Sequence, residues 1–578
     1  MDQKNLIAAI ALSIAILLGF HLLFPTSRQD APPPATTAPT ATTQPGQTSP
    51  AGSTPSEAPV VGAPQRPTLA AVRDRATILR ESPRVLIETP NVKGSIAKIG
   101  GSLDDLTLSH YRVHPTEGSP NVVLLSPAGA PNAYVAKFGW VASPGVAVPG
   151  DDTPWATDGD VLTPERPVTF TWDNGAGLVF SRTITIDRDY MFQVTQRVRN
   201  TGATAAVVYP FAFVARTGEP ETLGFFILHE GGLGVLDGAL SEESYSNIRS
   251  KGTIERRNTK GWLGFTDKYW LTAVIPDQAR AVTTAYRYIT AENRFRAEFR
   301  HDAMAVEPGA TIEVTDRLFA GAKVVRVIDG YERSLGISRF DLAIDWGWFF
   351  FLTKPMFLAL RYFNEHLGNF GLAILLLTVL VKLAFFPLAN KSYRAMSKMK
   401  VLAPEMKRIQ ERFKDDRQRM QQEVMALYRK EGANPLSGCL PIVVQIPVFF
   451  ALYKVLFVTI EMRHAPFYGW ITDLSELDHL NLFTLFNLVP WGPPSWLPII
   501  GLWPILMGIS MFLQQKLNPQ PTDPIQARIF MLLPIFFTFL LASFPAGLVI
   551  YWTWNNVLSI AQQWVIMRQS GVKNPIAN

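Results

Sequence analysis

The sequence predicts a multi-domain membrane protein, in which an all-β domain precedes an α-helical transmembrane core. Apolar residues make up 47% of the 578 residues and charged residues only 18%, which suggests that part of the chain lies in lipid. The apolar runs occur at the extreme N-terminus and after about Trp346. Between them, mixed charge and frequent Gly and Pro are typical of a soluble domain.

The first element is an apolar stretch at residues 6–24, about as long as a membrane span. No cleavage site of the A-x-A type follows it, so residues 1–24 are predicted to be an uncleaved anchor with Lys4 in the cytoplasm. Residues 25–67 are rich in Pro, Thr and Ala and hold too little apolar surface to offset the entropy of ordering. They are predicted to be a disordered periplasmic linker.

Residues 68–335 carry strand signals. Apolar residues alternate with Thr over 168–172, an Asp-Asn-Gly turn follows, and the alternation resumes over 178–186 and 192–198. Repeated hairpins of this kind predict an antiparallel sandwich that is large enough to bury its own core.

After Tyr331 the pattern changes. Residues 340–351 combine Asp341 and Asp345 with aromatic and aliphatic residues, which predicts a short amphipathic helix at the membrane surface, within an interfacial segment 336–352. The alternative is that these residues begin the next spanning helix.

The region 353–568 is predicted to be a helical membrane core. Length and apolarity predict five spans, at residues 367–388, 436–458, 496–513, 529–544 and 548–566. With the anchor the total is six, so both termini should lie on one side, including the tail 569–578.

The loop at residues 390–432 sets the orientation. It holds twelve basic and six acidic residues, whereas Arg463 is the one Lys or Arg of the connection 461–495. The positive-inside rule therefore places this loop and both termini in the cytoplasm and the β domain in the periplasm. Apolar residues recur at helical spacing on both sides of Asp415-Asp416, which predicts a helical hairpin at 391–432; a solvated charged loop is the alternative.

Lys382 is the one formal charge within residues 368–390. An ionisable group at membrane depth costs about 2.5–3.5 kcal/mol and usually faces protein or water, although a lysine this close to the cytoplasmic end could instead extend to the headgroups. Thr378 lies one turn before it, Gln445 lies on the next span, and Asn555, Asn556 and Gln562 lie on the last. Together these groups predict a hydrated recess among the helices.

Catalytic and metal chemistry are not indicated. Cys439 is the single cysteine, and the sequence holds no P-loop, no G-x-S-x-G elbow and no H-E-x-x-H. We therefore expect no cofactor, no metal site and no enzymatic activity.

Several ordered motifs resemble the YidC, Oxa and Alb family of membrane insertases. They lie at residues 399–405, 425–430, 434–441, 445–453 and 544–552. The resemblance covers residues 340–568, and G-W-L-G-F at 261–265 with K-Y-W at 268–270 is similar to the Gram-negative form. It implies that the β domain is a supersandwich of the galactose-mutarotase type, a fold that by itself confers no activity.

The resemblance also implies a mechanism in the inner membrane. Members hold a cation, usually arginine, in a groove that opens to the cytoplasm and to lipid, and Lys382 occupies the matching position without the planar donor fork of arginine. The client-binding groove is expected to include Lys382, Thr378, Gln445, Tyr551 and Trp552. The apolar face that a client helix would follow is expected to comprise Ile446, Phe449, Phe450, Phe530, Leu533 and Phe537.

The cytoplasmic hairpin is expected to contact the ribosome, the targeting machinery or the client, with anionic lipid as an equal competitor. Its named residues are Lys400, Pro404, Glu405, Lys407, Arg408, Arg412, Asp415 and Asp416. Further expected partners are nascent membrane proteins, the Sec translocon and the bilayer. Three alternatives remain: a transporter with Lys382 as an anion site, an enzyme that acts on lipid or glycan, and a pure scaffold for the translocon.

Overall fold

The computed structural model forms two compact units. It describes residues 73–224, 228–258, 260–414, 416–432, 440–489, 499–518 and 524–569. The first unit comprises residues 1–107, 123–267 and 272–320, and the second comprises 108–122, 268–271 and 321–578. The predicted anchor 1–24, the linker 25–67 and nearly all of the tail 569–578 lie outside the described residues.

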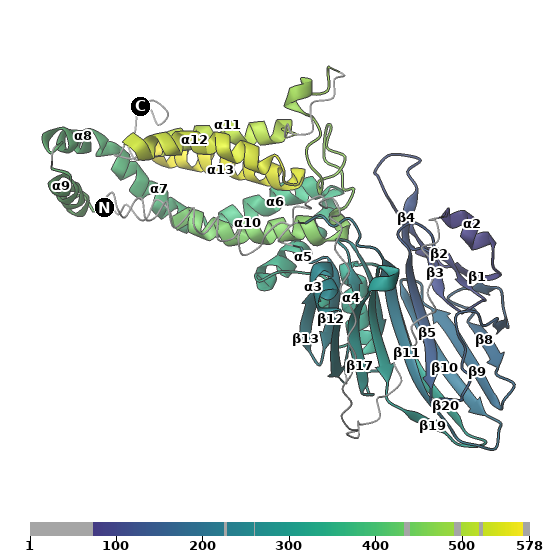
Figure 1. Cartoon of the computed structure of the whole chain (residues 1–578). Helices are drawn as coiled ribbons and strands as arrows, with labels where there is room; N and C mark the ends of the chain where they lie inside the picture. Colours follow the sequence, from purple (N-terminus) through teal and green to yellow (C-terminus); the bar gives the residue numbers. More distant parts are fainter. Residues whose placement is uncertain are drawn as a thin grey trace, which may run out of the picture. The chain divides into compact units, whose positions relative to one another are not determined.

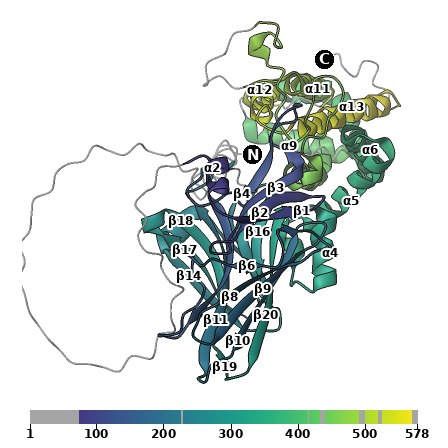
Figure 2. The same ribbon diagram turned by 90° about the vertical axis from the view of Figure 1, so that its right-hand side faces the viewer.

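The first unit is a β supersandwich of two sheets, as predicted (Figure 2). The 11-stranded sheet has the order β14(Thr253–Asn258), β17(Val282–Ile289), β18(Arg294–His301), β11(Ala206–Thr217), β5(Tyr134–Ala142), β3(Leu103–Arg112), β2(Val92–Ala97), β1(Arg84–Glu88), β7(Val161–Leu162), with β19(Met304–Val306) on β11 and β4(Asn121–Leu125) on β3. The 9-stranded sheet has the order β13(Ala239–Glu243), β12(Gly231–Leu236), β15(Gly261–Thr266), β16(Trp270–Ile275), β20(Thr311–Ala322), β10(Met191–Asn200), β9(Leu178–Ile186), β8(Val168–Asp173), β6(Ala156–Thr157). The short helices are α2(Arg75–Arg80), α3(Tyr245–Lys251) and η1(Thr290–Glu292).

The hairpins read from the alternation are confirmed in β8, β9 and β10. Val168 pairs with Ile184, and Phe192 pairs with Ile186, so the three strands form consecutive antiparallel pairs. Every second side chain of β9 is buried, which places the apolar face of the alternation in the core.

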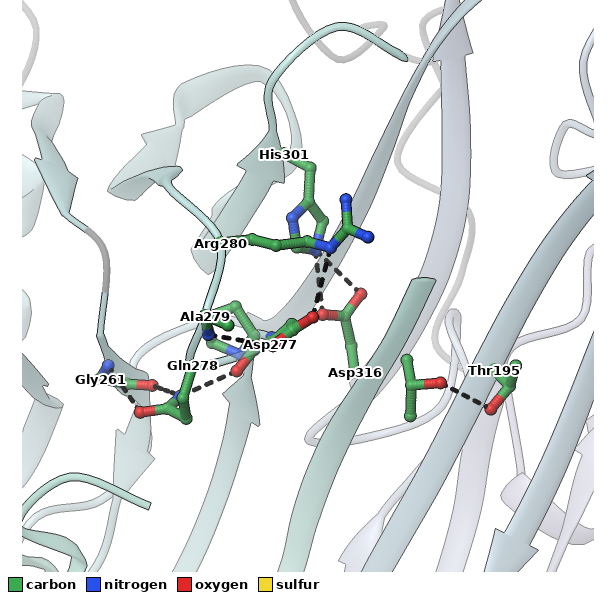
Figure 3. Close-up of polar contacts among 10 residues, drawn as sticks. Thr195, Gly261, Asp277, Gln278, Ala279, Arg280, His301 and Asp316 are labelled. Atoms are coloured by element: carbon green, nitrogen blue, oxygen red, sulfur yellow. Dashed lines mark hydrogen bonds and ion pairs between the residues drawn. The ribbon is translucent and has the colours of Figure 1, made fainter. Parts of the chain in front are cut away.

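A polar pair joins the two sheets inside the sandwich (Figure 3). His301 at the end of β18 places its Nε2 atom 2.9 Å from Oδ1 of Asp316 on β20, and the two side chains are 1% and 0% exposed. The same carboxylate oxygen accepts a hydrogen bond from the backbone N–H of Asp277 at 3.0 Å. Asp316 therefore satisfies a buried imidazole and a partly buried backbone N–H.

We expect Asp316→Ala to destabilise the sandwich by about 2–4 kcal/mol, because it leaves a buried imidazole and a partly buried backbone N–H without their acceptor. Thr195→Ala is the matched control: its hydroxyl lies 3.0 Å from that of Thr315 on the same β20, but at a half-buried position where water can replace the partner. The melting temperature of the full chain measures both. Equal shifts in the two variants would contradict this account of Asp316.

The second unit is helical (Figure 1). Its helices are α4(Val325–Leu335), η2(Phe340–Ala343), α5(Phe350–Leu367), α6(Phe370–Ala384), α7(Phe386–Val401), α8(Ala403–Arg412), α9(Arg417–Lys430), α10(Leu440–Val458), η4(Ile460–Met462), η5(Leu482–Thr484), α11(Leu502–Leu517), α12(Pro524–Leu541), α13(Ala546–Gln569). In Figure 1, α6, α10, α11, α12 and α13 run alongside one another, and α8 and α9 lie beyond the end of α7.

A helix lies in each of the five segments that were predicted to span. By length and hydropathy, none of the described helices qualifies alone as a span, whereas α6 and α7 qualify together with a bend of 69° between them. The bend was not predicted. Pro387 lies in the first turn of α7, where it has no N–H to donate to the preceding turn, so α6 ends before it.

The helix predicted over 340–351 is wrong. Only η2 forms there, and α5 begins at Phe350. Gly347 adopts a φ of +71°, its N–H donates to Asp345 Oδ1 at 3.0 Å, and Trp346 packs on Phe357. The aspartates and aromatic residues that suggested an interfacial helix instead belong to a turn, and Asp345 in this turn forms its contacts within the protein.

Glu461 in η4 connects the end of α10 to the start of α4. Its Oε1 accepts a hydrogen bond from the N–H of Val325 at 3.1 Å, which caps a helix whose own N-cap residue, Val324, makes no side-chain cap. The other oxygen, Oε2, is buried with no hydrogen-bond partner in the described part of the chain. Burial raises the pKa of Glu461 from 4.5 to about 7.

This carboxyl should make stability depend on pH. Because the folded-state pKa is raised, the contribution is fully present below about pH 4.5 and is lost as the pH rises to about 7, at a total of about 3 kcal/mol. We expect Glu461→Gln to flatten the decline in melting temperature between pH 5 and 7 and to stabilise the chain at pH 8. An unchanged slope would show that other groups dominate this range.

Candidate functional site

Lys382 lies in the last turn of α6, directly before the bend. Its Nζ donates a hydrogen bond to Ser559 Oγ on α13 at 2.6 Å, and this hydroxyl in turn donates to the carbonyl of Asn555 at 2.8 Å. Among the described residues, no Asp or Glu forms an ion pair with Lys382. The ammonium is therefore bonded to a neutral hydroxyl on α13, and no ion pair compensates its charge within the described residues.

Lys454 on α10 gives the contrast. It is the other lysine within a predicted span, and its Nζ lies 2.5 Å from Asp345 Oδ2. Its side chain is only 12% exposed, and its ammonium is paired within the protein. Of the two lysines in the predicted spans, Lys454 is paired with a carboxylate, whereas Lys382 is not paired with one among the described residues.

Two hollows meet at Lys382. The smaller, about 30 Å³, lies between α6, α7 and α10, and is large enough for one or two waters. The larger, about 400 Å³, lies between α6, α7 and α13. The smaller is lined by Val381, Lys382, Phe385, Leu388, Ala389, Tyr393, Gln445 and Val448. The larger also contains Asn390, Arg394 and Gln562. Neither lining includes an Asp or a Glu among the described residues, and those that line the larger hollow include the two cations Lys382 and Arg394.

Of the other predicted groove residues, Gln445 lines a hollow, whereas Thr378, Tyr551 and Trp552 do not. Gln445 lines the smaller hollow, and its Nε2 donates to the Tyr551 hydroxyl, which ties α10 to α13. Thr378 is 2% exposed and donates to the carbonyl of Ile374 on its own helix, so its hydroxyl faces neither hollow. Trp552 packs between Phe449 and Phe537, at 4.6 and 6.1 Å between ring centroids.

The predicted apolar face is partly exposed. Ile446, Phe450 and Phe530 are 47%, 41% and 40% exposed, whereas Phe449, Leu533 and Phe537 are half-buried. On α12 the exposed surface extends further than predicted, through Met531, Leu532, Ile535, Phe536 and Phe539. A contiguous apolar surface of this extent is typical of contact with lipid or with another apolar segment.

Sequence reasoning missed three residues at the site. Ser559 is the direct partner of Lys382, Tyr393 lines the smaller hollow, and Arg394 supplies the second cation of the larger one. Ser559 lies one turn after Asn555 and could have been found from that spacing. The roles of Tyr393 and Arg394 depend on the bend at Phe385, because a straight helix would carry both away from Lys382.

The hairpin predicted at residues 391–432 forms the two helices α8 and α9, as predicted. Met406 on α8 and Leu427 on α9 are buried, and the Tyr428 hydroxyl donates to Met406 Sδ at 2.8 Å. Glu405 lies in the first turn of α8, and Asp416 caps α9 by accepting from the N–H of Arg419. Exposed residues include Pro404, Lys407, Arg408 and Arg412; Lys400 donates to the carbonyl of Lys516, and Asp415 lies outside the described residues.

These features define a class of protein: a two-part chain with a β supersandwich and an apolar helical unit, in which Lys382 lies beside two hollows. Two family models divide the chain between them. The YidC periplasmic domain matches residues 84–359, and the family described as 60Kd inner membrane protein matches residues 362–573.

Relatives match over nearly the whole chain. The Membrane protein insertase YidC of Methylorubrum extorquens is 49% identical over 99% of this chain and 96% of its own length. That of Granulibacter bethesdensis is 49% identical over 100% and 99%. The chain therefore belongs to the YidC family of membrane protein insertases, a family of inner-membrane proteins rather than of catalytic enzymes.

Solved structures resemble the chain less closely. A crystal structure of an active YidC insertase is 17% identical, covers 83% of this chain and 92% of its own, and gives a TM-score of 0.36. A galactose mutarotase-like protein from Lactobacillus casei is 11% identical over 41% of this chain and 99% of its own, with a TM-score of 0.28. Both scores lie below 0.5, so family membership rests on the sequence matches.

Proposed function

We propose that this chain inserts hydrophobic segments of newly made proteins into the inner membrane, and that Lys382 receives the polar tail of the client. The observation that carries the proposal is the position of Lys382, bonded to a serine hydroxyl beside two hollows that contain no carboxylate. The names of the relatives support the insertion activity.

The polar step uses the recess. A short acidic tail would enter the larger hollow from the cytoplasmic side, attracted by Lys382 and by Arg394 at its more exposed end. Because a lysine ammonium is a compact point charge without a planar fork, binding requires charge but no fixed bidentate geometry. The tail thus finds a counter-charge at a depth where lipid offers none.

The apolar step uses the exposed faces of α10 and α12. The client segment would slide along Ile446, Phe450 and Phe530 while its tail remains in the recess. Burial of about twenty apolar residues in the hydrocarbon then drives insertion without nucleotide. The chain acts alone or beside the Sec translocon, and the hairpin α8–α9 recruits the ribosome or the targeting machinery.

We expect Lys382→Ala to slow the insertion of acidic-tailed clients by about tenfold to a hundredfold, the equivalent of losing one charge-assisted hydrogen bond of about 1.5–3 kcal/mol. The measurement is the insertion rate of a two-span client, with either an acidic or a neutral tail, into liposomes that contain the purified full-length chain and no translocon. Lys382→Arg should retain the activity, because it keeps the charge.

Lys382→Met is the matched control for side-chain length and packing. It should behave as Lys382→Ala does with acidic tails and should leave neutral-tailed clients within about twofold of the unchanged protein. Full insertion of acidic-tailed clients by both neutral variants would remove Lys382 from the mechanism but leave the insertase activity intact. Failure of the unchanged protein to insert any client alone would indicate an obligate role beside the translocon.

The hairpin is tested separately. Lys407→Gln, Arg408→Gln and Arg412→Gln together remove exposed charges from α8 and spare Met406, which packs the hairpin. We expect weaker ribosome cosedimentation. The slope of the logarithm of the binding constant against the logarithm of the salt concentration should become less steep by about 0.7–0.9 for each phosphate contact that is lost. Deletion of residues 404–429 is the stronger variant. Unchanged ribosome binding, together with weaker binding to anionic vesicles, would assign the hairpin to lipid instead.

A further inference from the structure

The connection between α10 and α11 contains a loop with unusual surface chemistry, residues 480–489, which we call the leucine loop. Leu485 and Leu488 are 58% and 82% exposed, and Leu482 and Val489 are exposed as well. From Asn481 to Gln515 the sequence contains no Asp, Glu, Lys, Arg or His. The loop thus presents aliphatic side chains outward at a place where water would favour polar ones.

The backbone N–H groups of the leucine loop are paired within the protein. Every N–H from Leu480 to Val489 has an acceptor within the protein. The acceptors are Asp478 Oδ1 for Leu480, His479 O for Asn481, Ile500 O for Leu482, Asn481 Oδ1 for Phe483, Asn481 O for Thr484 and Phe486, Leu482 O for Leu485, Thr484 Oγ1 for Asn487, Leu485 O for Leu488, and Thr484 O for Val489. Internal satisfaction of this kind is what an environment poor in hydrogen-bonding partners requires.

The loop conformation is costly and is held in place. Leu485, Phe486 and Asn487 all have positive φ, at 48°, 59° and 67°, a region that side chains with a Cβ rarely adopt. The hydroxyl of Thr484 donates to Asn487 Oδ1 at 2.9 Å, which fixes the turn. The strained backbone directs Leu485 and Leu488 outward, whereas Asn481 is 7% exposed.

The loop is anchored at the end of a helix in the membrane core. Asp478 is 2% exposed and accepts hydrogen bonds from Trp470 Nε1 at 2.8 Å and from the N–H of Trp503 in the first turn of α11 at 2.8 Å. The connection begins at η4, where Glu461 caps α4, which lies within the residues matched by the YidC periplasmic domain. The leucine loop therefore projects at the periplasmic end of the helices.

We propose that the leucine loop inserts its leucines into the periplasmic leaflet of the bilayer, so that its occupant is lipid rather than a protein partner. On α11, which the loop adjoins through Asp478 and Ile500, the apolar residues Leu506, Ile509, Phe512 and Leu513 are also exposed. The absence of charge and the internally paired N–H groups both match the boundary between headgroups and acyl chains. The inference is independent of the role given to Lys382.

The test places a probe on the loop. In a full-length Cys439→Ser background, Leu488→Cys is labelled with an environment-sensitive fluorophore and reconstituted in phosphatidylethanolamine–phosphatidylglycerol vesicles, with or without brominated acyl chains. We expect a blue-shifted emission, at least twofold quenching by brominated lipid, and little quenching by aqueous iodide. Leu240→Cys, at an exposed leucine of β13 in the β domain, is the matched control and should show the opposite pattern.

A second variant separates lipid from other occupants. Leu485→Asp, combined with the Leu488→Cys label, places a charge on the exposed side of the loop and should reduce the quenching by brominated lipid at least twofold. An emission at position 488 that equals that at position 240 would overturn the proposal. So would a blue-shifted label that brominated lipid does not quench, because that result indicates burial against a protein, such as a second copy of this chain.

Discussion

The helical unit is organised around the cost of burying a positive charge among apolar helices. Lys454 meets this cost with Asp345, and the pair fixes the turn before α5 against α10. Lys382 has no such carboxylate among the described residues, and its ammonium relies on Ser559 and on the space beside it. Burial of an ammonium group without a carboxylate partner costs free energy. Retaining the charge is consistent with a site that meets negative charge from outside the protein.

The bend between α6 and α7 gives Lys382 its surroundings. A straight continuation of α6 would carry Tyr393 and Arg394 away along the helix axis. Both hollows would then lose the lining residues that α7 contributes. The bend of 69° instead brings the start of α7 against the same space. By ending α6, Pro387 thus determines the shape of both hollows.

The sequence predicted the parts of this architecture that depend on local periodicity. Alternation of apolar and polar residues predicted β8 to β10 and their order of pairing, because burial of one face of a strand makes every second residue apolar. The length of the apolar runs predicted the positions of α6 and α10 to α13. The bend at Phe385 had a visible signal in Pro387, but the apolar run on both sides concealed it. The pair of Lys454 with Asp345 had no local signal, since 109 residues separate the partners. The false helix at 340–351 arose for the same reason: its aspartate and tryptophan looked amphipathic, but their partners come from elsewhere in the chain.

Magnitudes explain why a charged recess would suffice as an insertion device under the proposed mechanism. A span of about twenty residues gains roughly 0.3–0.6 kcal/mol per strongly apolar residue on insertion scales, whereas one acidic residue at the centre costs about 2.5–3.5 kcal/mol. The spans therefore supply the driving force, and the polar tail supplies the barrier. A counter-charge such as Lys382 acts on the barrier alone, because it binds the tail during passage and contributes nothing to the inserted state. The energy comes from the client, and the rate depends on the protein.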